Sequence, residues 1–133
     1  MLSIQRNNIS LFIKSLENVS VVRIGFVAYA EHIIDDENAT KYIIRKFFKE
    51  DKFDEPKELL FRYIQNSKLE SIEFNNVITT SGNRASKKIN LVVDINTNPE
   101  QSNRVDLNIF EKIINYTSER AKAYIEGFPN TAI

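Results

Sequence analysis

The chain has 133 residues and a mass of 15.4 kDa, a size typical of one globular domain. Hydrophobic residues make up 42% and charged residues 27%, which excludes a disordered chain. Eighteen basic residues balance eighteen acidic ones, which excludes a general electrostatic attraction to nucleic acid. The absence of cysteine and the single histidine exclude disulfides, thiolate chemistry and any metal site that needs two imidazoles. We expect one domain over residues 1–133.

The first part of the sequence predicts a helix and then a strand. Four apolar residues recur at helical spacing, which predicts a short amphipathic helix over residues 8–17. Residues 19–30 are dense in β-branched and aromatic side chains at both odd and even positions, which predicts a strand that is apolar on both faces. The four residues of the helix are Ile9, Phe12, Ile13 and Leu16.

The next segment predicts two helices that cross over the sheet. Asn38 follows three acidic residues and precedes apolar residues at helical spacing, which predicts a helix over about residues 39–49. Pro56 suits the first turn of a second helix. The apolar residues of that second helix would be Leu59, Leu60, Tyr63 and Ile64.

Two alternating segments, residues 69–80 and 87–97, predict strands. The turn-forming residues Ser81, Gly82 and Asn83 lie between them. We therefore predict an antiparallel β-hairpin with its turn at these three residues.

The last segment predicts the longest helix, because apolar residues recur at steps of three and four from Leu107 to Tyr124. Asp106 suits the N-cap, Gly127 suits the position after the helix, and Pro129 prevents its continuation. The elements together predict an α+β fold: an antiparallel or mixed β-sheet of three to four strands, helices packed on one face, and a long C-terminal helix.

Few residues suggest chemistry. His32 is the single residue of the type whose unperturbed pKa lies near neutrality, so it is a candidate pH-sensitive or ligand-binding residue. The neighbouring acidic residues Asp35, Asp36 and Glu37 could hold a hard cation, but negative charge at the start of a helix explains them without one. We therefore predict no catalytic residue, no metal and no cofactor, and we favour a non-enzymatic role while leaving an enzymatic one open.

Arg84, Lys87 and Lys88 cluster beside the predicted turn, where a basic hairpin could contact phosphates. This is the nucleic-acid alternative, although three charges on a neutral domain predict weak, salt-sensitive binding. Asp94 interrupts an apolar strand and either pairs with Arg23 or faces solvent.

Two strand segments, residues 21–29 (VVRIGFVAY) and 91–96 (LVVDIN), accompany a last helix that contains Phe110-Glu111-Lys112. In these features the chain resembles the C-terminal half of a sporadically distributed family of uncharacterised bacterial proteins. That resemblance implies a mixed sheet backed by helices, with no functional residues to carry over. The expected architecture and Gly127-Phe128-Pro129 are also similar to SecB-type chaperones, which have a four-stranded antiparallel sheet and a long C-terminal helix.

The apolar residues exceed what one face of a sheet can bury, notably in the two-faced first strand and at Phe47 and Phe48. We therefore predict a protein-interaction or accessory module that forms a homodimer or binds a protein partner; the alternatives are nucleic-acid binding and a SecB-like chaperone. No segment approaches the ~20 apolar residues that span a bilayer and no signal-like segment precedes the fold. We therefore expect no membrane association and a cytoplasmic location.

Overall fold

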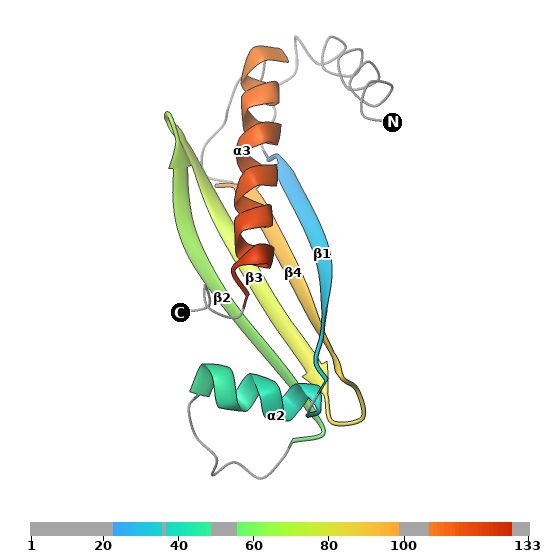
Figure 1. The fold of residues 1–133 in the computed structure, drawn as a ribbon. Helices are drawn as coiled ribbons and strands as arrows, with labels where there is room; N and C mark the ends of the chain where they lie inside the picture. The colour runs from blue at the N-terminus through green and yellow to red at the C-terminus, as the bar shows by residue number, and fades with distance from the viewer. Residues whose placement is uncertain (1–22, 36, 49–55, 99–106, 129–133) are drawn as a thin grey trace.

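The computed structural model describes residues 23–35, 37–48, 56–98 and 107–128. Four strands form an antiparallel sheet in the order β1-β4-β3-β2, and the helices pack on one face of it (Figure 1). The predicted α+β class, with its antiparallel sheet and long C-terminal helix, is confirmed. The elements are β1 (Gly25–Ile33), α2 (Ala39–Ile43), the π-helical turn η1 (Ile44–Phe48), β2 (Glu58–Leu69), β3 (Ile72–Asn83), β4 (Lys88–Thr97) and α3 (Leu107–Glu126).

The core lies between the inner face of the sheet and the helices. Alternate residues of β3 and β4 are buried there, because successive side chains of a strand point to opposite faces. α3 contributes Ile113 and Ala121 to the part of the core that contains Phe74 and Ile95. A second part lies under α2, where Ile43 packs with buried residues that include Ile89.

The predicted hairpin is confirmed, but its turn lies further along the chain. β3 pairs with β4 in antiparallel register from Phe74 to Ser81, and β3 itself continues to Asn83. Gly82 is therefore a strand residue opposite Leu59 on β2 and not a turn residue. Its lack of a side chain has another cause: a Cβ at this position would lie 2.5 Å from the Cβ of Ala39, so α2 sits directly on the glycine.

The predicted helix after Pro56 is wrong, because this segment is the edge strand β2. The apolar pairs at 59–60 and 63–64 fit helical spacing, but Phe61 lies between them and completes an alternation. Leu59, Phe61 and Tyr63 are half-buried, while Leu60 and Ile64 are exposed. The segment forms a strand and not a helix because it pairs with β3 along its whole length.

The other predicted helices agree with the structure where it describes them. The helix predicted over residues 39–49 is α2 and η1, and the Asn38 side chain caps it by accepting a hydrogen bond from the backbone N–H of Lys41 (2.9 Å). α3 ends at Glu126, and the N–H of Gly127 donates to the carbonyl of Ala123 (3.0 Å). The predicted helix over residues 8–17, the first part of the predicted strand, Asp106 and Pro129 lie outside the described residues.

Candidate interaction surface

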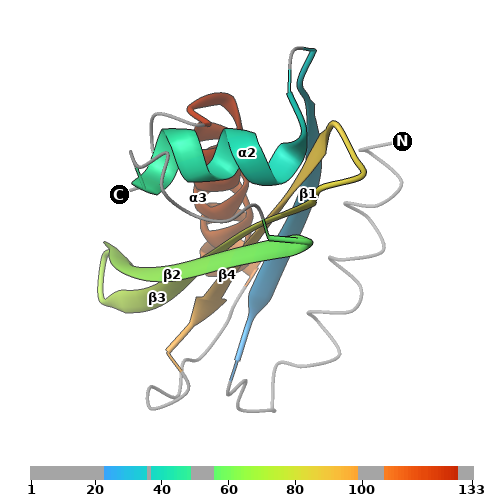
Figure 2. The same ribbon diagram turned by 90° about the horizontal axis from the view of Figure 1, so that it is seen from below.

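The outer face of the sheet, opposite the helices, gathers exposed apolar side chains. Seen from below, α2 and α3 lie on the same side of the strands (Figure 2). Of the side chains on the other side, Tyr29 is 78% exposed and Leu60 is 69% exposed. Large hydrophobic side chains are normally exposed singly, so a group of them on one face marks a candidate interaction surface. We call this the outer patch; it consists of Val27, Tyr29, Ile33, Leu60, Ile64, Val77 and Val92.

The strand register places five of the seven outer-patch residues next to one another. One row across the sheet runs from Val27 through Asp94 and Val77 to Ile64. The next row runs from Tyr29 through Val92 and Thr79 to Arg62, so it is apolar on β1 and β4 and polar on β3 and β2. Leu60 lies opposite Ser81 and Ile33 lies opposite Lys88, so these two residues are set apart from the other five.

Asp94 lies on the outer face of the sheet, between Val27 and Val77 of the outer patch. It is half-buried and accepts a hydrogen bond from the side-chain amide of Asn96 (3.1 Å). Its register partner on β1 is Val27, while Arg23 precedes the strand, so the predicted alternative in which Asp94 faces solvent agrees with the structure and the pairing with Arg23 does not.

β1 is also an edge strand of the sheet, and one side of its backbone has no partner strand among the described residues. The carbonyl of Ile24 accepts a bond from the N–H of Thr97, and the N–H of Ile34 donates to the carbonyl of Lys87 (both 2.9 Å). In an antiparallel pair the bonded positions alternate, so the even-numbered residues between them bond to β4. The N–H and C=O groups of Val27, Tyr29 and other odd-numbered residues therefore point away from the sheet.

The two edges of the sheet differ in their protection. Sheets commonly protect an edge with charged side chains or proline, which discourage a further strand from pairing there. β2 carries Arg62 and Lys68 along its length, whereas β1 has no lysine, arginine or proline and has Glu31 as its single acidic residue. Of the two edge strands, β1 is the one that is open to another strand.

The turn between β3 and β4 brings the three predicted basic residues together. Lys88 forms an ion pair with Glu31 (3.5 Å), and the Lys87 ammonium group donates to the backbone carbonyl of Asp35 (2.9 Å). Arg84 is exposed, and its backbone N–H donates to the carbonyl of Lys57 (2.9 Å). Two of the three cations thus have local structural partners, which weakens the electrostatic argument for nucleic-acid binding.

His32 lies on the inner side of β1 among aromatic rings and is half-buried. Its ring centroid is 5.2 Å from that of Phe128 and 5.9 Å from that of Tyr42. These distances fit ordinary aromatic packing. His32 therefore helps to hold the end of α3 against β1 and α2, and a role in ligand binding stays a prediction.

The acidic residues near His32 are dispersed. Glu37 pairs with Arg45, and Glu31 pairs with Lys88 on the outer face. Asp36 lies outside the described residues. Within the part of the chain that the structure describes, no group of three metal-ligating side chains comes together.

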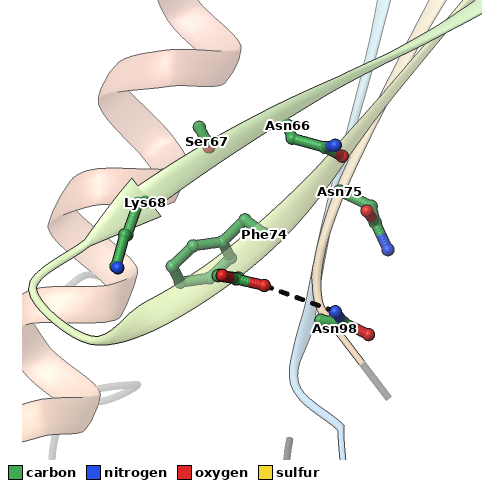
Figure 3. A pocket seen from close by; sticks show the side chains of 7 residues that line it. Asn66, Ser67, Lys68, Phe74, Asn75 and Asn98 are labelled. Carbon is green, nitrogen blue, oxygen red and sulfur yellow. Dashed lines mark hydrogen bonds between the residues drawn. The ribbon is translucent and has the colours of Figure 1, made fainter. Parts of the chain in front are cut away.

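A cavity of about 320 Å³ lies near the β2–β3 hairpin, and the sequence analysis did not predict it (Figure 3). The side-chain amide of Asn98 approaches the Glu73 carboxylate at 3.5 Å, and its backbone N–H donates to the Glu73 carbonyl (2.9 Å). Amide and hydroxyl groups here could hydrogen-bond a small polar molecule, but they include no paired nucleophile and base. The cavity is lined by Asn66, Ser67, Lys68, Glu73, Phe74, Asn75 and Asn98.

A small polar network connects α3 to β2. The Tyr124 hydroxyl donates to the side-chain oxygen of Gln65 (2.7 Å) and accepts from the Arg120 guanidinium group (3.3 Å). Burial, and to a lesser extent the nearby Tyr124, raises the pKa of Tyr63 above its ordinary value. The network fixes the helix to an edge strand, a structural role.

Comparison with known proteins found no matching family model, no matching curated protein and no matching solved structure. None of the helices in the described part of the chain is long and apolar enough to cross a membrane. The features that suggest a function are therefore geometric: the outer patch and the open edge of β1. The sequence indicated that this strand is apolar on both faces, but it contained no signal that the strand lies at an edge.

Proposed function

We propose that this chain is a non-enzymatic protein-interaction module that self-associates, with β1 of one copy pairing with β1 of a second copy. The open edge of β1 is the single observation that carries this proposal. Two identical strands can pair in antiparallel orientation about a two-fold axis, and each then satisfies the backbone groups of the other. The pairing would join two four-stranded sheets into one continuous sheet of eight.

The apolar side chains of β1 support the same proposal. Val27, Tyr29 and Ile33 are exposed at 45%, 78% and 66%, and pairing at the edge would place these side chains beside odd-numbered side chains of the second copy on the same face. The likeness to SecB-type chaperones concerns the fold, and fold alone does not determine function. The two local partners of the basic hairpin make nucleic-acid binding the weaker alternative.

A proline at position 31 tests this proposal directly. The N–H of Glu31 points toward the open edge, so proline there blocks pairing with a second strand and leaves the bonds from β1 to β4 intact. We expect light scattering to give about twice 15.4 kDa for the wild type and about 15.4 kDa for Glu31→Pro.

Glu31→Ala is the matched control, because it also removes the exposed ion pair with Lys88 but keeps the backbone N–H. We expect this variant to remain dimeric. A monomeric wild type, or a Glu31→Pro variant that is folded by circular dichroism and still dimeric, would contradict pairing through this edge.

A further inference from the structure

The outer patch needs a cover other than the second copy at the β1 edge. Pairing at an edge extends a sheet sideways and leaves both of its faces as they were. Ile64 and Leu60 on β2 are 57% and 69% exposed and lie on the strand farthest from β1. Among the described residues, the helices all pack on the inner face, so the described part of the chain provides no cover for this surface.

From the outer patch and the sequence that precedes β1, we infer that residues 8–17 of the same chain dock on the outer patch as an amphipathic helix. Ile9, Phe12, Ile13 and Leu16 follow the i, i+3, i+4, i+7 pattern and would form one apolar side of such a helix. A short amphipathic helix gains most of its stability by packing this side against another surface. The inner face of the sheet already carries α2 and α3.

The dimensions of the two partners agree. A ten-residue helix is about 15 Å long and about 10 Å wide. The patch crosses four strands, a span of about 14 Å at the usual strand spacing, and extends about 20 Å along β1 from Val27 to Ile33. Such a helix would cover the five adjoining residues of the patch, which occupy two rows, and would leave Leu60 and Ile33 at its margin.

The point where the described chain begins also favours this occupant. Ile24 is held to β4 through the backbone and side chain of Thr97, so the described chain enters the sheet at the end of β1 that is nearest the row of Val27. The seven residues between Glu17 and Gly25 can span about 23 Å when extended. Measured from Ile24, this length reaches the rows of Val27 and Tyr29, which lie about 10 Å and about 17 Å along β1.

The absence of cysteine from the chain makes a direct crosslinking test possible. The test pair is Ile13→Cys with Ile64→Cys, and the control pair is Ile13→Cys with Lys41→Cys, because Lys41 is exposed on α2 at the inner side of the sheet. A short bismaleimide is added to the full chain, and products are identified by peptide mass. Mixing isotopically labelled and unlabelled chains separates links within one chain from links between two.

We expect the test pair to give a link within one chain, at least tenfold more than the control pair. Adding Phe12→Glu should reduce the yield at least fivefold, while Lys14→Glu, which lies on the polar side of the predicted helix, should leave it unchanged. Equal yields from both pairs, or links between labelled and unlabelled chains only, would overturn the inference. Because the readout concerns a face and not the edge, it is independent of the oligomeric state tested by Glu31→Pro.

Discussion

Substituting alanine for Gly82 should destabilise the fold by forcing α2 away from β3. The new Cβ would lie 2.5 Å from the Cβ of Ala39, whereas carbon atoms normally approach to about 3.5–4.0 Å. The Ala39 Cβ has no torsion that could move it aside, so the helix itself must shift by about 1 Å. The Cδ1 of Ile43, at 3.2 Å from the new atom, belongs to a flexible side chain and can move at lower cost.

The magnitude follows from two opposing effects. Overpacking of a core by one methyl group typically costs about 1–3 kcal/mol. Replacing glycine restricts the unfolded chain and returns about 0.4–1 kcal/mol. We therefore expect Gly82→Ala to lower the free energy of unfolding by about 1–2 kcal/mol, measured by urea denaturation with the slope unchanged.

The double variant Gly82→Ala with Ala39→Gly identifies the cause. Removing the Ala39 methyl group leaves the Cδ1 of Ile43 as the nearest remaining neighbour of the new Cβ. Ala39→Gly alone should cost up to about 1 kcal/mol through helix propensity, but the two changes together should cost less than their sum by at least about 1 kcal/mol. Additive effects, or an alanine variant as stable as the wild type, would refute close packing of α2 on Gly82.

Two further changes test the interior. The pKa of Tyr63 is raised in the folded protein, so the unfolded chain loses the phenol proton first as the pH rises above about 10. The free energy of unfolding should therefore fall from about pH 9 to about pH 11, and it should fall less steeply in Tyr63→Phe. Equal slopes of the free energy of unfolding against pH in the two proteins would contradict this. The Nδ2 atom of Asn76 is buried without a hydrogen-bond partner among the described residues, while its Oδ1 accepts a long bond (3.4 Å) from the hydroxyl of half-buried Ser67. Because the unsatisfied amide costs more than this long bond returns, Asn76→Leu should raise the free energy of unfolding by about 1 kcal/mol in urea denaturation, and a loss of stability would contradict this.

Local patterns predicted the elements that are long or strongly periodic. The twenty residues of α3 show helical spacing throughout, and the alternation in β3 and β4 separates a buried from a less buried face. The sequence analysis predicted a helix in place of β2 because the apolar residues of this segment fit both the helical repeat and the strand alternation over a short window. Only the ladder with β3, from Glu58 to Leu69, distinguishes the two interpretations, and a ladder is not a local property.

The candidate surface could not be predicted for a related reason. Its position depends on β1 pairing with β4, which brings Ile24 next to Thr97 across 73 residues of sequence. The composition of β1 indicated that both of its faces are apolar, and the structure bears this out. Strand order then decides which of those apolar faces is buried and which backbone groups remain unpaired.

The geometry of β1 gives each part of the strand a separate role. Its even-numbered side chains, such as Phe26 and Ala28, pack against the core, and its odd-numbered side chains contribute to the outer patch. Its odd-numbered backbone groups point to the open edge. A change of backbone at Glu31 therefore tests the edge while preserving the side chains of the patch, and a change of side chain at Ile64 tests the patch while preserving the edge. The dimer and the docked helix can thus fail independently, and the failure of one leaves the argument for the other intact.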